Sequence, residues 1–141
     1  MKITILGSVA FRKEMIDVRS RLAELGHEGI ISPVMEELAL GKNPELLAKI
    51  EREHAEAKRE GGYIKWYYNS IVNSDAVLVL NLNKNGKENY IGGNVLMEIG
   101  FAHVHDKKIF LYNPVPEYSS YLDEIKAMAE TVLDGDLTKI S

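Results

Sequence analysis

The sequence has no cysteine, no long apolar run and no excess of basic residues. Without cysteine there is no disulfide framework, no thiolate nucleophile and no thiolate metal site. No apolar run approaches the roughly 20 residues of a membrane-spanning helix, so we expect no membrane partner. The 17 lysines and arginines stand against 21 acidic residues, a net charge of −4. This balance predicts no nucleic-acid partner.

The length and the first residues of the chain predict a single domain that begins with a buried strand. At 141 residues with 45% hydrophobic residues, residues 1–141 are expected to form one domain with a buried core. The first ten residues carry one lysine before an apolar run that ends at Gly7-Ser8. This pattern is typical of a buried strand and not of a signal peptide, so we expect a cytoplasmic protein.

The first third of the chain predicts a strand–helix–strand unit. A strand over residues 3–6 ends at the Gly7-Ser8 turn, and residues 12–25 have helical apolar spacing that stops at Gly26. A second strand is expected at residues 29–31. Residues 41–61 are interpreted as an inserted charged helix with Asn43 as its cap. It would be a lid, an oligomer contact or, in the preferred interpretation, a solvated helix.

The remaining chain alternates between strands and helices. The expected strands are 76–80, 108–112 and 130–133, and the expected helices are 63–73, 93–105 and 119–129. Such alternation predicts an α/β fold with a doubly wound, parallel five-stranded sheet of the Rossmann or flavodoxin-like type. Right-handed crossovers favour the strand order 2-1-3-4-5.

Ligands of open parallel sheets bind beyond the carboxyl ends of the strands. Gly7 and Ser8 after the first strand are therefore candidate phosphate or ribose contacts, and Arg12 could pair with a phosphate. The alternative is an ordinary turn followed by solvated cations. Asn81 opens the polar loop after the third strand and is a further candidate contact.

The stronger signal is the segment from Tyr90 through Gly92-Gly93-Asn94. Glycines at a helix start expose backbone N–H groups, which suit an anion or a sugar hydroxyl. Glu98 lies on the same side of this helix as Asn94, among apolar neighbours. A carboxylate there is either an exposed polar group or, in the favoured interpretation, a nucleophile or base in the cleft. The four histidines are interpreted as structural, so no metal is expected.

Two stretches resemble one enzyme family. Residues 74–81 (SDAVLVLN) and 92–102 (GGNVLMEIGFA) are similar to the nucleoside 2-deoxyribosyltransferases, which include nucleoside 5′-monophosphate N-glycosidases. The likeness spans most of the chain except 41–61. It implies that Glu98 is the nucleophile that attacks the anomeric carbon, and that Ser8 and Asn94 contact sugar or phosphate.

The chain departs from that family in the first strand, where some members have a tyrosine and this chain has Ile5 and Leu6, and at two later positions. Tyr67 stands where family members usually carry an aspartate that orients the nucleophile or protonates the base. Gly92 stands where many transferases have an acidic residue. A phenol from Tyr67, Tyr68 or Tyr90 is the candidate substitute, and a tyrosine among these or Tyr63 would also stack on the base.

Two functions therefore stay open. The first is cleavage or transfer of the N-glycosidic bond of a (deoxy)nucleoside or nucleoside 5′-monophosphate, without a cofactor. The second is a nucleotide-binding module without turnover. In both, the ligand is a nucleoside or nucleotide. A homodimer or higher homo-oligomer is expected, because active sites in this fold are often completed by a neighbouring subunit.

Overall fold

A computed structural model describes residues 1–53, 55, 59 and 62–141. The strands are β1 (Lys2–Leu6), β2 (Glu28–Ile30), β3 (Ala76–Val79), β4 (Lys108–Leu111) and β5 (Thr131–Val132). The α-helices are α1 (Arg12–Glu24), α2 (Pro33–Ala39), α3 (Pro44–Arg52), α5 (Tyr63–Val72), α6 (Gly93–Val104) and α7 (Leu122–Met128). Two short 3₁₀ helices, η1 (Val9–Phe11) and η2 (Leu137–Lys139), complete the description.

All five strands pair in parallel in one sheet, in the order β2-β1-β3-β4-β5. The predicted α/β class and strand order are thereby confirmed. In β1, Ile3 pairs with Ala76 of β3, and in β3 the same Ala76 pairs with Lys108 of β4. The carboxyl ends of β1, β3 and β4 consequently lie at one edge of the sheet, where a ligand site is expected.

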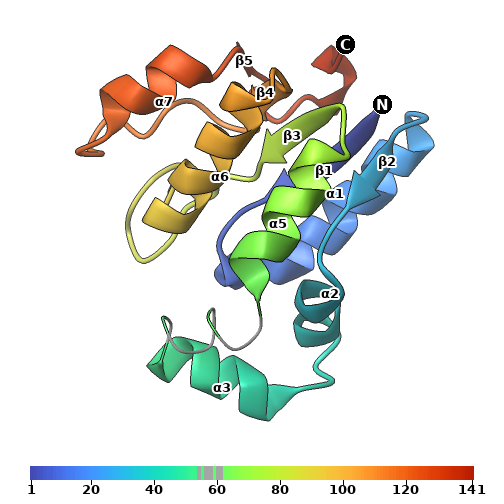
Figure 1. Ribbon diagram of the computed structural model, residues 1–141, viewed down its shortest axis with the longest axis vertical. Coiled ribbons are helices and arrows are strands. Elements are labelled where there is room, and N and C mark those ends of the chain that lie inside the picture. The colour runs from blue at the N-terminus through green and yellow to red at the C-terminus, as the bar shows by residue number, and fades with distance from the viewer. Residues whose placement is uncertain (54, 56–58, 60–61) are drawn as a thin grey trace.

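Helices cover both faces of the sheet. Residues of α1 such as Met15 and Leu22 pack with Ile3, Ile5 and Leu78 on one face. The opposite face carries α5, α6 and α7, which contribute Ile71, Ile99 and Ile125 to a second cluster. In Figure 1, α5 and α6 lie in front of the strands and α3 lies at the end of the molecule opposite both termini. Burial on both faces explains why β3 is apolar at every position.

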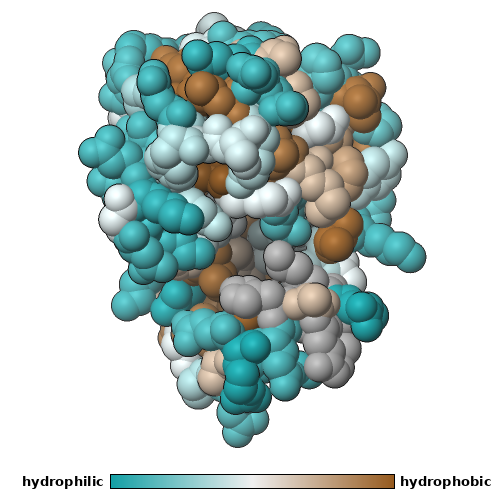
Figure 2. Space-filling model, turned by 90° about the vertical axis from the view of Figure 1, so that its left-hand side faces the viewer, coloured by the Kyte–Doolittle hydropathy of each residue, from teal (hydrophilic) through white to brown (hydrophobic). Residues whose placement is uncertain are grey.

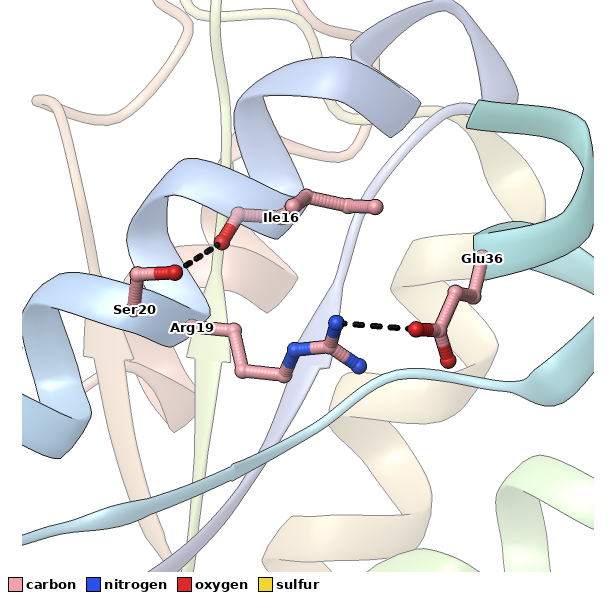
Figure 3. A network of polar contacts seen from close by, with 4 residues as sticks. All are labelled: Ile16, Arg19, Ser20 and Glu36. Atoms are coloured by element: carbon pink, nitrogen blue, oxygen red, sulfur yellow. Dashed lines mark hydrogen bonds and ion pairs between the residues drawn. The ribbon is translucent and has the colours of Figure 1, made fainter. Parts of the chain in front are cut away.

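The helix α2 is an element that the sequence analysis did not predict. Its cap is Ser32, whose Oγ accepts a hydrogen bond from the backbone N–H of Met35 at 3.0 Å, and Pro33 occupies its first turn. Figure 3 shows how α2 is tied to α1: Arg19 donates to a carboxylate oxygen of Glu36 at 3.1 Å. The guanidinium of Arg19 lowers the pKa of Glu36. This contact helps to place α2 beside the end of β1.

The predicted inserted helix is described only in part. Its cap is as expected, because the Oδ1 atom of Asn43 accepts from the N–H of Leu46 at 3.1 Å. The helix α3 ends at Arg52 and is shorter than the predicted span, while His54 and Gly61 lie outside the described residues. Among the helices that the structure describes, none has the length and hydropathy to cross a bilayer.

Candidate functional site

A cleft of about 210 Å³ opens at the carboxyl edge of the sheet. It is lined by Gly7, Ser8, Val9, Ser32, Val34, Met35, Leu38, Ile50, Tyr63, Tyr67, Lys84, Tyr90, Gly92, Gly93, Asn94, Val95 and Glu98. Figure 2 shows a hollow across the middle of one face of the molecule, with hydrophobic side chains visible inside it. The cleft thus joins segments that are far apart in the sequence, including most of the predicted site residues.

Glu98 is the acidic residue among the cleft-lining residues that the structure describes. It lies on α6, whose other inward positions, Val95, Ile99 and Ala102, pack against the sheet. This packing presents the Glu98 side chain to the cleft, where only 2% of the residue is exposed. The interpretation of Glu98 as an exposed polar residue is therefore wrong.

Tyr67 lies on α5 and lines the same cleft. Its hydroxyl donates a hydrogen bond to Oγ of Ser32 at 3.3 Å, and it is buried with 9% exposure. Burial raises the pKa of the Tyr67 hydroxyl to about 12, and the charge of Glu98 contributes to the increase. A phenol is protonated at physiological pH even at its usual pKa near 10, and the raised pKa holds that proton still more tightly, so the Tyr67 hydroxyl is a hydrogen-bond donor.

The start of α6 forms another part of the cleft. Gly92 precedes the helix in an extended conformation, no side chain caps the helix, and its first turn has no acidic residue. The first helical N–H that reaches the Gly92 carbonyl is that of Leu96, at 3.0 Å. The N–H groups before it point toward the cleft end of the helix, an arrangement that favours an anion or a hydroxyl.

Gly7 and Gly92 both lie in close contact with neighbouring side chains. A Cβ atom on Gly7 would lie 2.8 Å from the methyl of Met15 and 3.2 Å from the carbonyl oxygen of Leu80. A Cβ atom on Gly92 would lie 2.8 Å from the Tyr90 hydroxyl. Gly93 meets nothing within 4 Å. The second glycine of the pair is therefore open to the cleft, while the first lets Tyr90 fold over the helix start.

Ser8 and Lys84 meet across the cleft wall. The Ser8 side chain accepts from the Ala10 N–H at 3.2 Å and from Nζ of Lys84 at 3.0 Å. The ammonium group of Lys84 also lies 4.8 Å from the centre of the Tyr90 ring, within cation–π range. These contacts bring together the loop after β1 and the loop after β3.

The sequence analysis did not predict Lys84 or Ser32 as cleft residues. A signal for Lys84 was available, since the Asn85-Gly86 pair marks a tight turn. Asn85 and Gly86 have positive φ angles of 49° and 79°. The backbones of Lys84 and Lys87 exchange two hydrogen bonds of 2.9 Å. The turn sends the chain back toward the cleft. Ser32 carried the cap signal of α2, with Pro33 after it.

Asn81 and Arg12 are not among the residues that line the cleft. Asn81 is fully buried, and its amide donates to the carbonyl oxygens of Asn113 and Pro114 at 2.9 and 3.1 Å. The Asn113 N–H returns a 2.8 Å bond to Oδ1 of Asn81. Arg12 donates to the carbonyl of Val9 and borders a separate depression beside α2 and α3. Their predicted contacts with a ligand have no geometric support.

The described histidines lie elsewhere. The His27 ring is 3.0 Å from the N-terminal amine, and the His105 ring is hydrogen-bonded to the Tyr68 hydroxyl at 2.9 Å. Tyr68 is exposed on the outer surface and is not among the residues lining the cleft. Within the described part of the chain, no group of three or more histidine, aspartate or glutamate residues is arranged to hold a metal ion.

Comparison with known proteins gives a structural likeness without a sequence match. Neither protein-family models nor curated protein sequences match the chain. The chain resembles the solved structure of CMP N-glycosidase BcmB from Clostridium botulinum, with a TM-score of 0.53 at 16% identity. The match covers 93% of this chain and 84% of the other. At that identity the likeness shows a shared fold, which agrees with the five-stranded parallel sheet.

Proposed function

We propose that the chain cleaves or transfers the N-glycosidic bond of a (deoxy)nucleoside or nucleoside 5′-monophosphate, with Glu98 as the nucleophile. The observation that carries the proposal is the position of Glu98, 2% exposed at the wall of the cleft. An oxocarbenium-like sugar carbon is stabilised by a carboxylate beside it. The similarity of fold to a CMP N-glycosidase supports a nucleotide ligand.

The proposed reaction has two steps. An oxygen of Glu98 bonds to the anomeric carbon while the C–N bond breaks, and the electron pair leaves with the base, which takes up a proton. Water then attacks the anomeric carbon, the C–O bond to Glu98 breaks to restore the carboxylate, the sugar is released, and the proton of the water passes to the group that protonated the base or to solvent. A second base in place of that water would give transfer instead of hydrolysis.

Tyr67 is the proposed proton donor or positioning group near Glu98. Glycosidases commonly employ a second carboxyl group, but Glu98 is the only acidic residue among the lining residues that the structure describes. A phenol with a pKa of about 12 cannot serve as a base at neutral pH. To donate to Glu98 or to the leaving base, its hydroxyl would turn away from Ser32, which accepts its proton in the structure.

The remaining cleft contacts are proposed from their positions. Gly7, Ser8, Gly92, Gly93 and Asn94 would hold the sugar or its substituents through backbone N–H and hydroxyl groups. Tyr90 would border the ligand from the loop side. No cofactor enters the proposed reaction. The predicted homo-oligomer and cytoplasmic location stay predictions.

The test is release of free base. The protein is incubated with ribonucleosides, deoxyribonucleosides and their 5′-monophosphates, starting with the cytosine compounds, and free base is measured by chromatography. Replacing Glu98 by Gln should lower base release by at least about a thousandfold, as expected when a nucleophile is removed. The exposed Glu130→Gln is the control and should retain activity. Base release that survives in Glu98→Gln contradicts the proposed role.

A second candidate is a nucleotide-binding module without turnover. The single acidic residue among the described lining residues favours it, because no second carboxyl is there to protonate the base. In this case no substrate releases base, while calorimetry detects nucleotide binding. Glu98→Gln would then change the affinity alone.

A further inference from the structure

The cleft has two chemically different walls, and their difference bears on the substrate class. One wall is polar and combines Ser8, Lys84 and the start of α6. The other wall comes from α2, α3 and the start of α5, and its members are mainly apolar: Val34, Met35, Leu38, Ile50 and Tyr63. A ligand with one anionic end and one flat, largely apolar end matches such a site.

We propose that the polar wall binds the 5′-phosphate of the substrate, and that Lys84 selects nucleoside 5′-monophosphates over nucleosides. This inference rests on the proposed function, because it takes the ligand to be a nucleoside or nucleotide. It adds the substrate class that the site prefers and the residue that determines the preference.

The surroundings of Lys84 favour an anionic ligand. Its contacts are the Ser8 hydroxyl at 3.0 Å and the Tyr90 ring at 4.8 Å, both of them neutral groups. Within the part of the chain that the structure describes, no carboxylate forms an ion pair with Lys84. The ammonium group is half-buried in the cleft and its partners are neutral, so its positive charge is not compensated and is available to an anionic ligand.

Neighbouring groups provide further donors. Ser8 has a hydroxyl that can turn toward an oxygen of a bound phosphate. At the start of α6, Gly93 is open to the cleft, and neither a capping side chain nor an acidic residue occupies the first turn. A phosphate has three terminal oxygens, so an ammonium, a hydroxyl and backbone N–H groups together satisfy it.

The decisive experiment compares Lys84→Gln with Lys87→Gln. Lys87 belongs to the same tight turn but is exposed and does not line the cleft, so it is a matched control. For Lys84→Gln we expect kcat/KM for the 5′-monophosphate to fall by about ten- to a hundredfold, the size of a lost charge-assisted hydrogen bond. The value for the nucleoside should fall far less than the value for the 5′-monophosphate. Lys84→Arg should retain most of the preference.

Binding measurements separate this inference from the proposed function. CMP, cytidine and inorganic phosphate are titrated by calorimetry into Glu98→Gln and into Glu98→Gln with Lys84→Gln. A preference for CMP that disappears with Lys84 supports the inference even if no substrate is turned over. Equal binding of CMP and cytidine to the single variant overturns it, even if nucleosides release base. Inorganic phosphate that binds as tightly as CMP indicates a free-phosphate site and also overturns it.

Discussion

At the residue scale, the phenol of Tyr67 couples the fold to pH. Burial raises its pKa to about 12 from the usual 10. The folded state therefore holds the proton more tightly than the unfolded state does, and the associated stability is present below about pH 10. It is lost as the pH rises through the interval from about 10 to 12.

Replacing Tyr67 by Phe should remove this pH dependence. Between about pH 9 and pH 11, the unfolding free energy of the wild type should fall by about 1 kcal/mol more than that of Tyr67→Phe. Urea unfolding at each pH measures the difference. Tyr63, Tyr118 and Tyr121 also have raised pKa values, but they are present in both proteins and cancel. Parallel curves would show that Tyr67 ionises as an exposed phenol does.

Residue-scale prediction worked where a short local pattern determines the outcome. The glycine pair and the spacing to Glu98 lie within one helix, so the sequence alone places them on one side of it. The contact between Lys84 and Ser8 joins residues 76 positions apart. No periodicity encodes such a contact, because it depends on how two loops meet at the edge of the sheet.

At the element scale, hydrogen bonds of Asn81 connect the end of β3 to the segment after β4. Its side chain donates to two carbonyl groups and accepts from the N–H of Asn113, and Nδ2 of Asn113 donates to the Asn81 carbonyl at 3.1 Å. This set of bonds extends the pairing of the two strands beyond their last ladder residues, Val79 and Leu111. The structure therefore gives Asn81 a stabilising position.

Replacing Asn81 by Ala should destabilise the protein by about 3 kcal/mol, because backbone groups next to a fully buried side chain lose their partners. Chemical denaturation measures the change. The exposed Asn83→Ala serves as the control in the same loop, with a small expected effect. If Asn81 contacted substrate instead, the variant would keep its stability and show a raised KM.

Element-scale prediction depended on how distinct the local pattern is. The strand β3 was predicted because all of its residues are apolar, and the helix α6 was predicted because a glycine pair marks its start and it spans 12 residues. The helix α2 spans only Pro33–Ala39, too few residues for a helical period to stand out. Its cap signal at Ser32 and Pro33 was present, but it was interpreted as the end of the preceding strand.

At the scale of the whole molecule, general rules of chain topology were sufficient for the sheet. Alternation of strands and helices, parallel pairing and right-handed crossovers leave few arrangements, and the observed strand order is one of them. Those rules did not predict the apolar wall of the cleft. It comes from α2, α3 and the start of α5, whose placement depends on side-chain contacts such as that of Arg19 with Glu36.

The distribution of the cleft over the chain makes ligand binding a property of the folded state. The lining residues that the structure describes run from Gly7 to Glu98 across five elements and their loops, so the unfolded chain has no equivalent site. A nucleotide that binds the cleft must therefore stabilise the whole protein by mass action. At a free concentration of about 100 times Kd, the gain is about 2.7 kcal/mol.

We expect CMP at that concentration to raise the melting temperature of Glu98→Gln by about 10 °C, since 1 kcal/mol corresponds to roughly 3 to 4 °C for a chain of this length. The Glu98→Gln variant prevents turnover during the measurement. In urea, the midpoint should rise while the m value stays constant, because the surface exposed on unfolding is unchanged. A saturating nucleotide that leaves both midpoints where they were would contradict binding in the cleft.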